Sequence, residues 1–327
     1  MVNQVDSTST GSAIRYPSHE SAPPRARVVR RFLELIRFSH TVFALPFSAL
    51  ACVFALVVPN PVPVIGLGIA GRLLGVLLCM ITARSAAMAF NRLVDARFDR
   101  FNPRTANRHL PSGQLSPTQV WTFFLMTSLA FVAACTLFLP NWLPLAGSLP
   151  VLGWICGYSF AKRFTSAAHL WLGIALALSP ICTWISIRGE AVMLNFSDLL
   201  PACCLALAIA FWVAGFDIIY ACQDADADRA LKLHSIPARF GVRIALQIAA
   251  GLHLAMLIAL CFLPNFAELR LGWLYWITLL GVVVLVITQH WLVTPNDLTR
   301  VNIAFFNVNA VISFGFSFSA ALDSWLG

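Results

Sequence analysis

The stretch GIAGRLLGVLLCMITARSAAMAFNRLVDARFD, residues 68–99, runs from membrane-length apolar sequence straight into a polar segment. Its apolar part, residues 68–90, is long enough to cross the hydrocarbon core of a bilayer, which takes about 20 helical residues. Asn91, Asp95 and Asp99 follow at intervals of four residues, so on a helix they share one face. The stretch therefore predicts a membrane-spanning helix that ends in an acidic stripe.

The composition extends this prediction to the whole chain. Of its 327 residues 59% are hydrophobic and 11% are charged, and the mean hydropathy is +0.79, far from the values of soluble domains. About nine segments are apolar and long enough to span a membrane: residues 39–58, 68–90, 118–139, 144–161, 166–187, 199–217, 244–263, 271–291 and 303–322. We therefore expect an all-α polytopic membrane protein with about nine transmembrane helices.

A second acidic run, DIIYACQDADAD at residues 217–228, closes another apolar segment. Asp217, Tyr220, Asp224 and Asp228 repeat the helical spacing of the first run. Taken alone, either run could be a solvated helix end whose Asp and Arg side chains pair three or four residues apart. Two such runs at membrane boundaries, where each inserted charge costs up to about 3 kcal/mol, favour a functional role instead.

The basic residues set the expected orientation. Of the 22 Lys and Arg residues, 18 fall in the N-terminal segment and in alternate loops, whereas Arg188 and Arg270 fall in loops on the other side. Because cytoplasmic loops are rich in Lys and Arg, we expect an integral protein of a bacterial inner (plasma) membrane, with its N-terminus and both acidic runs in the cytoplasm. Residues 1–28 are polar and rich in Ser, Pro and Arg, which predicts a disordered basic tail before one transmembrane domain at residues 29–327.

Oxygen ligands from the two acidic runs predict a magnesium site. Neighbouring carboxylates repel one another unless cations lie between them, and Mg²⁺ binds a few carboxylates together with phosphate oxygens and water. Arg84, Lys162, Arg163 and Arg37 are candidate cations for the remaining charge of a diphosphate, since guanidinium and ammonium groups bind phosphate. The membrane setting then indicates a lipid diphosphate as substrate, with membrane lipid around the protein and no nucleic acid partner.

Four stretches, in the same order, resemble the UbiA-type integral-membrane aromatic prenyltransferases, in particular their 4-hydroxybenzoate polyprenyltransferase-like branch. They are HTVFALPF (40–47), ARSAAMAFNRLVDARFDRFNPRTANRHLPSG (83–113), YSFAKRFT (158–165) and DIIYACQDADADRALKLHSIPARFG (217–241). The resemblance covers nearly the whole chain beyond the N-terminal tail. It implies a bundle of transmembrane helices around a central lipid-facing cavity, capped on the cytoplasmic side by the two acidic loops.

The resemblance also implies a set of site residues. The metal and diphosphate site would comprise Asp95, Asp99, Asp217, Asp224 and Asp228. Catalytic roles are implied for Asp95, Asp224, Tyr158 and Lys162, and substrate-binding roles for Asn91, Tyr220, Arg163, Arg84 and His40, the last two on the acceptor side. One departure is clear: many relatives carry Asp directly after the motif Asn, whereas this chain has Arg92.

The implied reaction is the Mg²⁺-dependent transfer of a polyprenyl group from polyprenyl diphosphate to an aromatic hydroxy acid. Departure of the diphosphate gives the allylic carbon cationic character, which aromatic side chains can stabilise, and a carbon of the phenol ring attacks before the ring loses a proton. The acceptor ring stays open between two compounds. 4-Hydroxybenzoate would place the protein in ubiquinone biosynthesis, and 1,4-dihydroxy-6-naphthoate would place it in futalosine-route menaquinone biosynthesis.

A cation- or proton-coupled membrane transporter is the alternative from another functional class, because acidic residues in membrane spans also build ion pathways. Transport sites are expected near the bilayer midplane on broken helices. Here the carboxylates fall at span ends among Arg and Lys residues, which suits an anionic substrate. The sequence therefore favours the transferase.

Overall fold

The computed structural model describes residues 24–35, 45–59 and 66–327, with side chains from residue 30 onward. Within these ranges the chain is almost entirely helical, with no strands and one isolated β-bridge between Thr294 and Asp297. Eight spans there are long and apolar enough to cross a membrane. They contain α3 (Gly68–Asp99), α4 (Pro117–Cys135), α5 (Leu143–Ala161), α6 (Ala168–Leu194), α7 (Leu200–Ala221), α10 (Val242–Phe262), α11 (Trp273–Leu292) and α12 (Asn309–Leu326). The expected all-α polytopic membrane protein is confirmed.

Three predicted segments differ from the helices that form. The segment at 39–58 contains α2 (Leu45–Val57), whose 13 residues are fewer than the roughly 20 that a crossing takes; residues 36–44 and 60–65 lie outside the described part. The segments at 68–90 and 166–187 continue as helix to Asp99 and Leu194. Both extensions carry polar residues, which stop a run of apolar sequence without stopping a helix.

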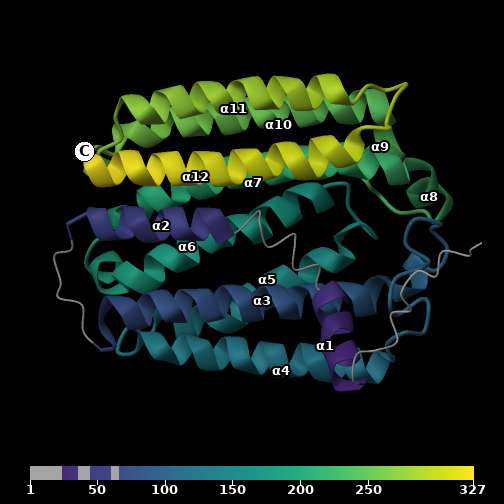
Figure 1. The fold of residues 1–327 in the computed structure, drawn as a ribbon, viewed down its shortest axis with the longest axis horizontal. Helices are drawn as coiled ribbons and strands as arrows, with labels where there is room; N and C mark the ends of the chain where they lie inside the picture. Colours follow the sequence, from purple (N-terminus) through teal and green to yellow (C-terminus); the bar gives the residue numbers. More distant parts are fainter. Residues whose placement is uncertain (1–23, 36–44, 60–65) are drawn as a thin grey trace, which may run out of the picture.

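α7 lies at the centre of the bundle. It packs against α6 and α10, while α2 packs against α6 and α12, and α3 packs against α4 (Figure 1). Trp212 of α7 is buried, lies edge-on to Phe47 and Phe216, and donates its indole N–H to Asn309 Oδ1 at 3.0 Å. Because its polar group has a partner, this side chain is stable in the interior. The burial of α7 fixes the position of its C-terminal part, which carries Asp217.

The two acidic runs meet at one end of the bundle, which we call the acidic end. α3 stops there at Asp99, and α7 stops there at Ala221. Residues 100–116, α8 (Ala225–Ala230) and α9 (Ile236–Phe240) lie over this end as a cap, and the C-terminus lies at the opposite end (Figure 1).

α1 (Pro24–Leu35) is a short helix that crosses α3 and α4 near the acidic end (Figure 1). Its last residue, Leu35, is buried against Ala89, Leu115 and Val120. The expected end of the N-terminal tail, residue 28, falls inside this helix. Residues 1–23 lie outside the described part, so the disordered tail stays a prediction.

The opposite end of the bundle depends on a buried arginine. Arg188 lies inside α6, where that helix kinks, and not in a loop as its charge suggested. Its guanidinium donates to Asp198 Oδ1 at 2.6 Å and to the carbonyl oxygens of Val58 and Pro59 at 2.7 and 3.0 Å. These bonds satisfy the buried charge, and they tie α6 to the end of α2 and to the residues that precede α7.

Arg72 of α3 makes a second link of the same kind. It is buried and donates to Glu190 Oε1 at 2.7 Å and to the carbonyl oxygen of Ile187 at 2.6 Å. Both acceptors belong to α6 beside its kink. Hydrogen bonds of Arg72 and Arg188 therefore hold the kinked part of α6 against both α3 and α2.

We expect Arg188→Leu to lower the free energy of unfolding by about 3 kcal/mol or more, because it leaves the carboxylate of Asp198 without its buried cation. Denaturant unfolding in detergent micelles measures the effect. Arg300→Leu removes an exposed arginine and serves as the control, since surface substitutions change stability little. Adding Asp198→Asn to R188L should restore part of the loss, and an R188L variant as stable as wild type would contradict the role given to this arginine.

Candidate active site

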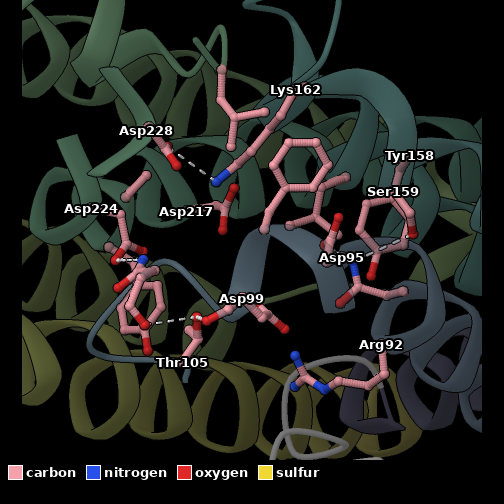
Figure 2. Close-up of a pocket in the computed structure, with 18 of the residues that line it drawn as sticks. Arg92, Asp95, Asp99, Thr105, Tyr158, Ser159, Lys162, Asp217, Asp224 and Asp228 are labelled. Carbon is pink, nitrogen blue, oxygen red and sulfur yellow. Dashed lines mark hydrogen bonds and ion pairs between the residues drawn. The ribbon is translucent and has the colours of Figure 1, made fainter. Parts of the chain in front are cut away.

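A polar cavity of about 300 Å³, which we call the polar chamber, lies at the acidic end of the bundle. It brings together the predicted site residues Arg84, Asn91, Asp95, Asp99, Tyr158, Lys162, Arg163, Asp217, Tyr220, Asp224 and Asp228. Figure 2 shows several of them around one open space. His40, which was also predicted, lies outside the described residues. Side chains from three distant stretches of sequence therefore share one chamber, while their individual roles stay predictions.

Each of the five motif carboxylates faces its own basic side chain. The pairs are Asp95 with Arg163 (3.7 Å), Asp99 with Arg108 (2.7 Å), Asp217 with His169 (2.7 Å), Asp224 with Arg104 (2.5 Å) and Asp228 with Lys162 (3.6 Å). A basic partner offsets the repulsion that clustered carboxylates would otherwise experience. The carboxylates therefore stand apart, and among the described residues no three Asp, Glu, His or Cys side chains converge closely enough to hold a metal ion.

The first motif is held by contacts of α3 with the end of α5. Asn91 donates its amide N–H to Asp95 Oδ2 at 2.7 Å. Arg163 donates to the carbonyl oxygen of Val94 at 2.8 Å, and its guanidinium lies 4.8 Å from the centre of the Phe98 ring. The Nε of Arg163 is buried and has no hydrogen-bond partner among the described residues. Arg163 is thus fixed beside Asp95 and keeps an unused donor.

Arg104 connects the segment after α3 to the second acidic motif. Its Nε donates to Asp224 Oδ1 at 2.9 Å, and the amide of Asn102 donates to the same oxygen at 3.0 Å. Its Nη1 donates to the hydroxyl oxygen of Tyr220 at 2.9 Å. The turn that carries Arg104 is fixed by the Thr105 hydroxyl, which donates to a backbone carbonyl at the end of α3 (2.9 Å; Figure 2). The segment after α3 therefore closes one side of the chamber.

Sequence reasoning missed four of these partners. Arg104 and Arg108 were interpreted only as markers of membrane orientation, although their position directly after the first motif was a usable signal. Asn102 stands in the same segment and was not considered. His169 lies in a predicted apolar segment, 166–187, where nothing in the spacing indicates a partner for Asp217.

Lys162 faces the second motif from the end of α5. Its Nζ lies 3.6 Å from Asp228 Oδ2 (Figure 2). Burial lowers the pKa of Lys162, but the carboxylates of Asp228, Asp217 and Asp224 outweigh burial and keep this pKa above its ordinary value. Lys162 is therefore an ammonium group at neutral pH, and its charge is available to an anion in the chamber.

Arg84 lies inside the membrane-spanning part of α3, two helical turns before Asn91 and about 10 Å from it along the helix axis. Its Nε is buried and has no hydrogen-bond partner in the part of the chain that the structure describes. A second cavity of about 170 Å³ is lined mainly by apolar residues of α3, α5 and α6, and we call it the apolar cavity. Arg84 and Tyr158 border both cavities, so a guanidinium with an unused donor stands where they meet.

The basic side chains of the polar chamber outnumber its carboxylates. They are Arg84, Arg92, Arg104, Arg108, Lys162 and Arg163, against five aspartates. Arg92, the residue that departs from the family pattern, is buried with its Nε 3.5 Å from the carbonyl oxygen of Leu35. This charge balance suits an anion bound together with a cation. The carboxylates also lie at helix ends and not at mid-span, which differs from the arrangement expected of a transporter.

The oxygen donors of the chamber fit Mg²⁺. The predicted ligands are all carboxylates, and no cysteine is among the described residues that line the chamber, as expected for a hard cation. Asp228 Oδ2 is buried, faces Lys162 at 3.6 Å, and has no hydrogen-bond partner among the residues that the structure describes. The basic partners of these carboxylates are of the kind that binds phosphate oxygens, and the carboxylates are of the kind that binds Mg²⁺.

Known proteins are similar to this chain in sequence and in fold. The model of a family described as the UbiA prenyltransferase family matches residues 42–311. The 4-hydroxybenzoate octaprenyltransferase of Edwardsiella ictaluri (strain 93-146) is 32% identical to this chain, over 74% of this chain and 80% of its own. The solved apo structure of a UbiA homologue from Aeropyrum pernix K1 is similar, with 28% identity and a TM-score of 0.74 over 87% of this chain and 98% of its own. A UbiA homologue from Archaeoglobus fulgidus, solved bound to GPP and Mg²⁺, shares the fold with 16% identity and a TM-score of 0.59 over 89% of this chain and 99% of its own.

We expect Asp224→Asn to weaken the binding of Mn²⁺, a spectroscopic substitute for Mg²⁺, by at least about 10-fold in the presence of inorganic pyrophosphate, because the substitution removes a charge from the chamber. Electron paramagnetic resonance of the full chain in micelles measures the free Mn²⁺. Asp226→Asn is the matched control, since Asp226 is 97% exposed, pairs with Arg229 and does not line the chamber. Equal losses in the two variants would contradict the assignment of Asp224.

Proposed function

The chain belongs to the UbiA prenyltransferase family, and from that premise we propose that it transfers a polyprenyl group from polyprenyl diphosphate to an aromatic hydroxy acid, with Mg²⁺ as cofactor. One observation carries the proposal: a polar chamber lined by acidic and basic groups meets an apolar cavity at Arg84. The chamber suits a diphosphate, the apolar cavity suits a hydrocarbon chain, and Arg84 suits a carboxylate. The relative whose structure was solved with bound GPP and Mg²⁺ supports the proposal that a prenyl diphosphate and a metal ion bind here.

The diphosphate would lie among the motif residues. Asp95, Asp99, Asp217, Asp224 and Asp228 would hold Mg²⁺ together with diphosphate oxygens, and the metal would supply charge neutralisation for the departing diphosphate. Lys162 and Arg163 lie 3.6 and 3.7 Å from their aspartate partners, longer than direct charge-assisted hydrogen bonds, so they would be available to phosphate oxygens. Each then exchanges one anionic partner for another, which keeps the desolvated charges paired.

Aromatic side chains line the polar chamber beside the second motif. The rings of Tyr220 and Phe305 lie 4.1 Å apart, and Phe216 lies edge-on to Phe305 at 5.4 Å. Ring faces stabilise a nearby positive charge, so they can stabilise the allylic carbon as its bond to diphosphate breaks. The prenyl chain would continue from there into the apolar cavity.

We assign Arg84 to the carboxylate of the acceptor. A guanidinium binds a carboxylate through two parallel N–H bonds, and Arg84 has an unused buried donor at the junction of the two cavities. A ring carbon of the acceptor forms the new C–C bond to the allylic carbon as the C–O bond to diphosphate breaks. The ring proton then leaves to an aspartate such as Asp95 or to the diphosphate, and aromaticity returns.

4-Hydroxybenzoate is the acceptor that we propose, because relatives carrying the name 4-hydroxybenzoate octaprenyltransferase match most of the chain. The alternative acceptor is 1,4-dihydroxy-6-naphthoate, which carries a single carboxylate as 4-hydroxybenzoate does and would meet the same Arg84. We further propose that the acidic end faces the cytoplasm of a bacterial inner membrane, since the loops at that end carry most of the Lys and Arg residues.

Isolated membranes that contain the chain are expected to form a prenylated product from labelled polyprenyl diphosphate, Mg²⁺ and 4-hydroxybenzoate. A parallel reaction offers 1,4-dihydroxy-6-naphthoate, and product from that ring alone would reassign the pathway to menaquinone. EDTA treatment and the Asp95→Ala variant are the inactive controls, since each removes the proposed metal site. Absence of product with both rings would contradict the proposed transfer.

Arg84→Gln should raise the KM for the aromatic acid by at least about 10-fold and leave the KM for polyprenyl diphosphate within about twofold, because a charge-assisted contact with the carboxylate is lost. Arg84→Lys should recover only part of the loss, since an ammonium group cannot form two parallel bonds. Steady-state kinetics with each substrate varied in turn measures both constants. A rise confined to the KM for the diphosphate would assign Arg84 to the other substrate.

A further inference from the structure

His169 is a fully buried histidine in contact with the second acidic motif. It is the second residue of α6, it is 0% exposed, and its Nδ1 lies 2.7 Å from Asp217 Oδ2. Its other ring nitrogen, Nε2, lies 3.4 Å from the backbone nitrogen of Ile236, the first residue of α9. Both ring nitrogens are therefore engaged, one by the chamber and one by the cap.

These two contacts determine where the neutral ring carries its proton. A backbone N–H can only donate, so the N–H of Ile236 donates to Nε2 of His169. The ring proton is then on Nδ1, from which it is donated to the carboxylate of Asp217. The ring nitrogen that accepts the bond from Ile236 therefore faces the cap, and His169 is not among the described residues that line the polar chamber.

The cap segment that contains Ile236, residues 231–240, is attached to the connection between α5 and α6 at two further points. The backbone N–H of His234 donates to the carbonyl oxygen of Lys162 at 2.7 Å. Arg239 Nη1 donates to Ser166 Oγ at 3.3 Å. Lys162 also faces Asp228. The connection between α5 and α6 therefore contacts the cap segment and also contributes a residue to the polar chamber.

We propose that His169 is a positioning residue, which orients Asp217 for Mg²⁺ and links that carboxylate to cap segment 231–240. The inference rests on the proposed function, which places Mg²⁺ and a diphosphate in the polar chamber. Nδ1–H engages Oδ2 of Asp217 and leaves Oδ1 for a ligand in the open space where Figure 2 shows this residue. Partners that orient a metal-binding group in this way change metal affinity by about 10- to 100-fold.

Two substitutions separate the two contacts of the ring. His169→Asn places an amide N–H near the position of Nδ1 and can keep the bond to Asp217, but it does not reach Ile236. His169→Gln places its amide near the position of Nε2 and can keep the bond from Ile236, but it withdraws from Asp217. His290→Asn is the matched control, because His290 contacts His253, at 2.9 Å, and does not line the polar chamber.

The test uses the full chain in detergent micelles and has two readouts besides turnover. Mn²⁺ binding in the presence of inorganic pyrophosphate should weaken by at least about 10-fold in H169Q and by less than about threefold in H169N. Amide hydrogen exchange in residues 231–240 should show the reverse order, with faster exchange in H169N than in H169Q. The H290N control should match wild type in both measurements, and thermal unfolding verifies that every variant is folded.

Wild-type Mn²⁺ affinity in H169Q would overturn the inference, and so would equal losses of affinity in H169Q and H169N. Failure of the proposed function gives a different pattern. The wild type would then bind Mn²⁺ with pyrophosphate but transfer no prenyl group. The difference in Mn²⁺ affinity between H169Q and H169N would remain, and it would still support the positioning role of His169. Absence of Mn²⁺ binding in the wild type would overturn the metal site and this inference together.

Discussion

Electrostatic repulsion among five carboxylates at one end of a lipid-facing bundle is the constraint on which the rest of this structure depends. Charges that lose water must find partners, and the fold provides an arginine or lysine for four of the carboxylates and the imidazole of His169 for Asp217. These partners come from the segment after α3, the connection that follows α5 and the first turn of α6, so these contacts also fix how four helices meet. The same contacts line a chamber with basic side chains, and these side chains can bind an anion in place of their aspartate partners.

Three arginines within the membrane-length helices, Arg72, Arg84 and Arg188, fall into two physical groups. Arg72 and Arg188 donate to carboxylates and to backbone carbonyls, so their charge is satisfied within the fold. Arg84 lies in a span as well, but its Nε has no partner among the described residues and it borders two cavities. A satisfied arginine stabilises helix packing, whereas an unsatisfied donor beside a cavity indicates a ligand. This contrast, and not depth in the membrane, separates the structural arginines from the one assigned to the acceptor.

The sequence was sufficient for those features whose signals are local. Apolar runs of membrane length predict the spans, and the four-residue spacing of Asn91, Asp95 and Asp99 predicts one polar face. The pairings were not predictable, because Arg104 and Asp224 are 120 residues apart and no pattern states which arginine meets which aspartate. The placement of Arg188 in a loop was wrong because a kink supplies partners that its charge alone does not predict.

The contact of Arg104 with Asp224 also restricts how this kind of sequence can diverge over generations. A substitution at either position alone leaves its former partner as a charge without a counter-charge inside the cap. A substitution at one position is therefore linked to a substitution at the other, although 120 residues separate them. The pair, and not the single residue, is the unit on which selection acts, so lineages should retain both members or exchange them together.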